Sequence, residues 1–166
     1  GSDFACSLRF PASFCGIVGL RPTPGVVPQG PNKMPFQALS VLGPLGRSVA
    51  DVGLGLDAFT GFDFRDPLSN PNSNKTNFRS AAEKPTAVHE FAYSDDLGLS
   101  VVSSEVKEVV SDAIRTLEGN GCKVNREFPD LEGSTFIFDT LRAFQFATLW
   151  GEATVKNRSK LKPEVS

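Results

Sequence analysis

Residues 1–23 read GSDFACSLRFPASFCGIVGLRPT, and this stretch decides how the rest of the chain is interpreted. It starts with a short turn of small and polar residues and continues into an apolar run. Residues 14–20 of that run predict a buried strand, because short apolar runs that end at turn residues are typical of strands inside a sheet. Pro22 and Pro24 end the strand, and its two glycines indicate close packing of another backbone segment against it.

The order of residues in this stretch resembles the second half of the amidase signature. In that motif a glycine-rich turn carries a nucleophilic serine, and Arg, Pro, Ala and a Cys-Gly-x-x-Gly-Leu-(Lys/Arg)-Pro-Thr strand follow. A second ordered match, Gly-Pro-x-x-Arg-(Ser/Thr)-x-x-Asp and then Gly-x-Asp-x-x-Asp-Pro, falls within residues 43–67. The resemblance is tight over residues 1–67, looser over residues 85–130, and fades after that. It implies an α/β fold with a mixed sheet flanked by helices, of which residues 1–166 form the central portion of an amidase domain.

The resemblance assigns the chemistry to the turn itself. Ser7 occupies the place of the family's nucleophile, which implies amide hydrolysis through a serine acyl-enzyme. The backbone N–H groups of Phe4, Ala5, Cys6 and Ser7 would form the oxyanion hole. Such donors stabilise the negative charge that develops on a carbonyl oxygen as it becomes tetrahedral, which is worth several kcal/mol.

One feature of the turn departs from the family's motif and another agrees with it. The family has Gly-Gly where this chain has Ala5-Cys6, and glycine is favoured there because it tolerates positive φ and close approach of a ligand. We therefore expect a narrowed or altered site on an intact fold. Asp3 and Arg9 flank the serine and match positions that hold the nucleophile loop in the family, where a carboxylate and a guanidinium can pair through two hydrogen bonds.

The family's catalytic set is a Ser-cisSer-Lys triad, and its lysine and bridging serine precede the segment that this chain matches. The chain has no lysine before Ser7, and the first one is Lys33. The 166 residues are therefore expected to be an internal piece of a longer enzyme, inactive alone. His89 is the one histidine available as an alternative base. It stands in a plain Val-His-Glu context that favours an ordinary surface or strand residue.

Two other functions stay open at this stage. The family also includes A-type subunits of tRNA-dependent amidotransferases, which work in a heteromeric complex. A noncatalytic homologue is the other, and Ala5-Cys6 is the one feature that suggests it. The expected partners are a small-molecule amide substrate and either a second copy of the chain or amidotransferase subunits. An upstream lysine followed by a Gly-Ser-rich segment would favour an enzyme.

Composition limits the remaining classes. The chain has 40% hydrophobic and 22% charged residues and a net charge of −2. It therefore has enough apolar content for a core and no basic surface for nucleic acid or anionic membrane. Three cysteines, Cys6, Cys15 and Cys122, have no metal-ligand spacing and cannot all pair. We predict no metal and no cofactor, and the thiols fit a reducing compartment such as the cytoplasm.

The rest of the first half is predicted to be loop and helix. Residues 21–40 are rich in proline and glycine and predict a loop with at most a short Val26-Val27 strand. Ser48 and Asp51 form a capping pattern that opens a helix. Asp63 and Asp66 are interpreted as a loop clasp in preference to a pair of catalytic acids. Residues 69–85 predict a polar, mobile connector.

The second half predicts a strand, helix, strand unit. Residues 87–93 and 122–128 are the strands, and a helix capped by Ser103 or Ser104 lies between them, which indicates a crossover between parallel strands. Residues 135–150 predict a helix with a wide apolar face that is too short and interrupted to span a bilayer. That face favours core packing, with an apolar acyl pocket as the alternative.

Overall fold

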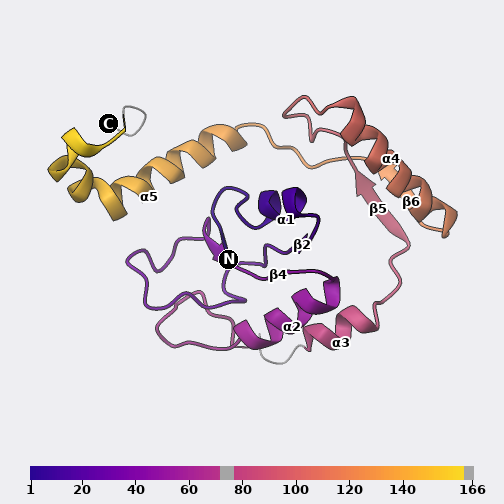
Figure 1. The fold of residues 1–166 in the computed structure, drawn as a ribbon, viewed down its shortest axis with the longest axis horizontal. Helices are drawn as coiled ribbons and strands as arrows, with labels where there is room; N and C mark the ends of the chain where they lie inside the picture. Colours follow the sequence, from indigo (N-terminus) through magenta and orange to yellow (C-terminus); the bar gives the residue numbers. More distant parts are fainter. Residues whose placement is uncertain (72–76, 163–166) are drawn as a thin grey trace. The chain divides into compact units, whose positions relative to one another are not determined.

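The computed structural model describes residues 1–71 and 77–162 (Figure 1). The chain forms two compact units, Gly1–Thr86 and Ala87–Ser166. The described residues contain three two-stranded sheets together with helices, so the architecture is α/β as predicted. Within these ranges no helix combines the length and hydropathy needed to cross a membrane.

The first unit is built on two short antiparallel strand pairs. Strand β1 (Ser2–Asp3) pairs with β3 (Val41–Leu42), so that Asp3 lies opposite Val41. Strand β2 (Val18–Gly19) pairs with β4 (Leu45–Gly46). Helix α1 (Arg9–Cys15) connects β1 to β2. The pairings hold the beginning and the end of the signature stretch against the same chain segment.

The predicted strand at residues 14–20 is wrong in its first half. Helix α1 continues through Cys15 and ends at Gly16, which adopts a left-handed φ of 60°. Phe14 is 91% exposed because α1 turns only Ala12 into the core. The predicted close packing is found at Gly19, where an added Cβ would lie 2.4 Å from the Leu8 carbonyl oxygen.

Helix α2 (Val49–Phe59) begins as predicted. The Ser48 hydroxyl accepts a hydrogen bond from the Asp51 N–H at 3.1 Å. This bond satisfies one of the donors left open in the first helical turn. Residues 21–40 are loop, and no strand forms at Val26-Val27.

Helix α3 (Phe78–Glu83) lies within the predicted connector of residues 69–85, of which residues 72–76 are outside the described residues. The Asn77 side chain caps its start, and the Asp57 carboxylate of α2 accepts from the Phe78 N–H at 2.7 Å. Gly53 lets the two helices meet, since a Cβ there would lie 2.7 Å from the Phe78 carbonyl oxygen. Figure 1 shows α3 running beside α2. This part of the connector is thus packed structure.

The second unit contains the predicted crossover. Strands β5 (Glu90–Tyr93) and β6 (Lys123–Arg126) are parallel, and helix α4 (Ser104–Gly119) connects them. Helix α5 (Ser134–Lys156) follows, and a short 3₁₀ turn, η2 (Arg158–Lys160), comes after it. Helix α5 is thus longer than the predicted residues 135–150.

Burial differs between the two units. The buried apolar side chains of the described residues all belong to the first unit: Leu8, Ala12, Val27, Val41, Val52 and Leu56. In α5, Phe136 is 76% exposed, and Phe144 and Trp150 are also exposed. The apolar face of α5 is therefore neither packed into a core nor closed over a pocket by the described residues of its own unit.

Candidate active site

Ser7 lies on a turn between the end of β1 and the start of α1, and its side chain is exposed. The next residue, Leu8, is 0% exposed and anchors the turn in the core of the first unit. The Phe10 N–H donates to the Cys6 carbonyl oxygen at 2.8 Å, so helical hydrogen bonding begins directly beside Ser7. The serine is therefore presented to solvent on a backbone that is fixed at both ends.

The turn folds around the carboxylate of Asp3, which is completely buried. Its Oδ1 accepts from the Cys6 N–H at 2.8 Å, and its Oδ2 accepts from the Leu8 N–H at 3.2 Å. A buried carboxylate is costly unless its oxygens are hydrogen-bonded. The charge of Asp3 therefore favours the backbone conformation that places these two amides on either side of Ser7.

Arg9 completes the pair with Asp3. Its Nε donates to Oδ2 and its Nη2 to Oδ1, both at 3.0 Å, in a two-pronged contact. The pKa of Asp3 is lowered to about 2, chiefly by the hydrogen bond from Arg9 and also by those from the amides of Leu8 and Cys6, while burial opposes the change. The same contact raises the pKa of Arg9. The structure thus brings together the two residues for which loop support was predicted.

Arg21 also reaches Asp3, and the sequence analysis assigned no role to it. Its Nη1 donates to the Asp3 carbonyl oxygen at 2.6 Å and lies 3.5 Å from Oδ1. In the sequence, the only indication of a role is that the amidase signature motif has Lys or Arg at this position of its strand. The sequence alone did not show that the guanidinium turns back to the nucleophile turn.

The two departures from Gly-Gly differ in backbone conformation. Cys6 has a φ of 72°, in the left-handed region, whereas Ala5 is not among the residues of positive φ in the described chain. The left-handed conformation costs a residue with a Cβ roughly 1–2 kcal/mol. The departure at Cys6 is therefore strained, and the one at Ala5 is not.

We predict opposite stability effects for glycine at these two positions. Cys6→Gly removes left-handed strain and should raise the free energy of unfolding by about 1 kcal/mol. Ala5→Gly only adds freedom to the unfolded chain and should lower it by about 0.5–1 kcal/mol. Urea unfolding of the two single variants, each as the complete protein, measures both effects. Equal losses in the two variants would contradict the assignment of strain to Cys6.

One of the predicted oxyanion donors, the Cys6 N–H, has a partner within the turn. The Cys6 N–H is directed at Asp3, because the buried carboxylate needs that hydrogen bond. The assignment of the oxyanion hole to the backbone N–H groups of Phe4, Ala5, Cys6 and Ser7 stays a prediction.

The other candidate acids hold loop structure, and the histidine lies at the surface. Asp63 pairs with Arg65 through Oδ2 and Nη2 at 2.7 Å. Asp66 is buried and accepts from the Gln29 N–H at 2.7 Å. Both carboxylates therefore brace the loop that follows α2, as predicted. His89 is exposed and precedes β5.

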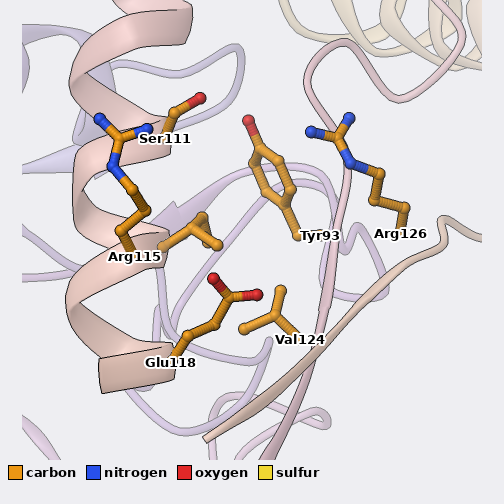
Figure 2. Close-up of a pocket in the computed structure, with 7 residues that line it drawn as sticks. Tyr93, Ser111, Arg115, Glu118, Val124 and Arg126 are labelled. Carbon is orange, nitrogen blue, oxygen red and sulfur yellow. The ribbon is translucent and has the colours of Figure 1, made fainter. Parts of the chain in front are cut away.

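The second unit contains a separate hollow of about 220 Å³ (Figure 2). Figure 2 shows Arg115 and Glu118 on α4 on one side of it, and Tyr93 and Arg126 on the other. Arg115 pairs with Asp112, and Arg126 lies 3.5 Å from the carboxylate of Asp95. The positive charges at this hollow are thus matched by acids, and none of the predicted site residues lines it.

Cysteines and acids do not gather into a metal site in the described part of the chain. Cys6, Cys15 and Cys122 are free thiols. Residues 1–71 and 77–162 contain no group of three His, Cys, Asp or Glu side chains placed to hold a metal ion.

Known proteins are similar to this chain in both sequence and fold. A family model described as Amidase matches residues 1–151. The chain belongs to the amidase signature family. The match continues past residue 130, where the resemblance in the signature motifs fades, so the family extends through β6 and most of α5.

The relatives within the amidase signature family include an acylamidase and A-type subunits of amidotransferases. An acylamidase of Rhodococcus erythropolis is 39% identical over 129 residues, which are 78% of this chain and 27% of that protein. The A-type subunit of the glutamyl-tRNA(Gln) amidotransferase of Staphylococcus saprophyticus is 39% identical over 124 residues, 75% of this chain and 25% of that protein. The chain thus spans about a quarter of the length of these relatives.

The solved structures similar to this chain include an acylamidase, an amidotransferase subunit and a cyclic dimer hydrolase. A bacterial aryl acylamidase of the amidase signature family superposes with a TM-score of 0.68 at 30% identity, over 80% of this chain and 26% of that one. The A-type subunit of the glutamyl-tRNA(Gln) amidotransferase of Thermotoga maritima gives 0.67 at 28% identity, over 83% and 30%. A 6-aminohexanoate cyclic dimer hydrolase gives 0.65 at 28% identity, over 78% and 28%.

Proposed function

We propose that Ser7 is the nucleophile of an amide hydrolase. Its Oγ forms a bond to the amide carbonyl carbon as its proton passes to a base, and the carbonyl π electrons move to the oxygen. The C–N bond then breaks, the amine leaves with a proton, and an acyl-enzyme remains on Ser7. Water hydrolyses this ester and restores the hydroxyl. The supporting observation is the Asp3-centred turn that presents Ser7, in a chain of the amidase signature family.

Asp3 and Arg9 act on this reaction through the backbone. They hold the turn rather than contact the substrate, since the carboxylate is buried and its oxygens face two amides and the guanidinium groups of Arg9 and Arg21. Preorganised amides need not reorient as the oxyanion forms, and this is why they stabilise the transition state more than water would.

The proton acceptor in this proposal lies outside residues 1–166. The family's lysine and bridging cis-serine precede the segment that the chain matches, and the chain covers 27% of the acylamidase relative. Residues 1–166 would then be a central portion of an amidase domain made of the two units described above.

We therefore predict that a polypeptide of residues 1–166 alone does not turn over amides. A missing general base typically costs about 10²- to 10⁴-fold in rate. The measurement is hydrolysis of p-nitroacetanilide by the purified 166-residue chain, with the Ser7→Ala form of the same chain as the control. Turnover clearly above this control would show that a base within residues 1–166 serves Ser7.

The substrate proposed is a small amide, because the acylamidase and the cyclic dimer hydrolase are named for amide hydrolysis. A role as the A-type component of a tRNA-dependent amidotransferase is the second candidate, favoured by relatives and a solved structure of that name. Purification of the complete protein from its own cells separates the two. Stable association with B- and C-type subunits favours the amidotransferase, whereas hydrolysis of an anilide by a monomer or homodimer favours the amidase.

The free thiols are in keeping with a cytoplasmic location.

A further inference from the structure

Gly19 on β2 lies against the residue that follows the proposed nucleophile. A Cβ added at Gly19 would lie 2.4 Å from the Leu8 carbonyl oxygen and 2.7 Å from the Ala12 Cβ. Gly19 is not among the glycines of positive φ, so its backbone conformation would accept a side chain. The obstacle to a side chain there is space alone. The glycine therefore lets the β2 backbone approach the Leu8 carbonyl closely.

Leu8 is held at three points. Its N–H donates to the Asp3 Oδ2 at 3.2 Å. Its side chain is completely buried, and a Cβ added at Gly43 would lie 2.8 Å from its Cδ1. Its carbonyl, against Gly19, is the third point. Close-packed interiors transmit a local displacement to their neighbours, so Leu8 has little room to shift by itself.

Strand β2 is fixed by β4 on its other side. Gly19 pairs with Leu45 in the antiparallel register, and the Leu20 N–H donates to the Pro44 carbonyl oxygen at 3.3 Å. The contact at Gly19 therefore relates the position of Leu8 to this strand pair. The Leu8 N–H and the Ser7 carbonyl belong to one planar peptide group. A displacement of Leu8 consequently moves the backbone of Ser7 with it.

We propose that Gly19 is a positioning residue for catalysis, because its lack of a side chain lets β2 set the place of Leu8 and, through Leu8, of the Ser7 Oγ. This inference rests on the proposed function, in which Ser7 is the nucleophile. Gly19 acts through Leu8 and not on the substrate.

The size of the effect follows from the contact distance. Ordinary contacts of a Cβ begin at 3.4 Å. Gly19→Ala must therefore move β2 and the Leu8 carbonyl apart by about 1 Å, and a misplacement of that size can cost about 10²-fold in rate.

The test compares Gly19→Ala with the matched control Gly53→Ala in the complete protein. Gly53 is a buried glycine of α2 in the same unit, and a Cβ there would lie 2.7 Å from the Phe78 carbonyl oxygen. Both variants thus force a methyl group against a backbone carbonyl, and both should lose stability to urea. Fluorophosphonate labelling taken to completion counts the active sites, and kcat and KM for p-nitroacetanilide are measured per labelled site.

We expect Gly19→Ala to lower kcat per labelled site about 10- to 100-fold, with KM little changed. Gly53→Ala should keep the kcat of the wild type. Equal kcat values in Gly19→Ala and Gly53→Ala would overturn the inference, since both changes would then act on stability only. A change in KM alone would overturn it as well.

A double variant identifies which contact of Gly19 matters. Gly19→Ala with Ala12→Gly removes the contact with the Ala12 Cβ and keeps the one with the Leu8 carbonyl. Its kcat per labelled site should stay 10- to 100-fold below that of Ala12→Gly, on the order expected for the single variant. Recovery of kcat in the double variant would assign the effect to the packing of α1 and overturn the inference.

Two further outcomes are decided by the same set of variants. If Gly19→Ala does not fold, the double variant decides by its kcat against that of Ala12→Gly. Ser7→Ala separates the two levels of the argument. Turnover or labelling retained in Ser7→Ala refutes the proposed nucleophile, whereas their loss there, with a normal kcat in Gly19→Ala, refutes the role of Gly19 alone.

Discussion

Ser7→Ala is expected to reduce turnover by the complete protein on the order of 10⁶-fold, because removal of a covalent nucleophile abolishes the acyl-enzyme route and leaves only binding and oxyanion stabilisation. Acyl-enzyme formation should be undetectable. The measurements are anilide hydrolysis and mass spectrometry after treatment with a fluorophosphonate. The folded structure should persist, because the Ser7 side chain is exposed and the turn is held by Asp3 and Leu8.

Two further variants make this result specific. Ser13→Ala changes another exposed serine, on α1, and should leave turnover unchanged. Cys6→Ser should keep most activity, although a thiolate is the better intrinsic nucleophile. A fluorophosphonate adduct on Cys6, with none on Ser7, would show that the cysteine has taken over the reaction.

Motifs with local chemistry could be predicted from the sequence. The start of α2 followed from Ser48 and Asp51, since a cap depends on residues three positions apart. The parallel crossover followed from the order of apolar runs with a helical pattern between them. The amidase signature motifs themselves fixed the family.

The failures arose where tertiary contacts outweighed the local pattern. Residues 14–20 form an apolar run that fits a strand or a buried helix equally, and the exposed Phe14 shows that it is not buried. Pro11 lies in the first turn of α1. It is a local indication of a helix start, because proline is tolerated there and its φ suits a helix. Helix α3 depends on the Asp57 carboxylate, 21 residues before Phe78, which no local pattern contains.

The candidate site shows the same division. The motif named Ser7, Asp3 and Arg9, and the structure brings the last two together. The structure alone shows that the Cys6 amide is engaged by Asp3 and that Arg21 reaches the turn. Both depend on which way a backbone group faces, and the sequence does not carry that information.

Asp3→Asn is expected to lower the free energy of unfolding by about 3 kcal/mol at neutral pH. Breaking a buried ion pair typically costs about 3–5 kcal/mol, and the lower end applies here because Arg9 is half-exposed. Asparagine keeps the shape, but it loses the charge that holds Arg9 and one acceptor for the amides of Cys6 and Leu8. Asp63→Asn is the matched control, because Asp63 also forms a two-pronged pair with an arginine, at the surface. Its effect should be clearly smaller.

The pH dependence distinguishes the charge of Asp3 from its shape. The pKa of Asp3 is lowered from 3.8 to about 2 in the folded protein, so its charge stabilises the fold fully above about pH 5. That contribution, about 2 kcal/mol from the pKa difference, disappears as the pH falls through about 2, where the folded protein also binds the proton. Urea unfolding of wild type and Asp3→Asn should therefore give a stability difference that narrows from about pH 5 to about pH 2. A difference that stays constant over this range would show that Asp3 supports the nucleophile turn through its shape and hydrogen bonds and not through its charge.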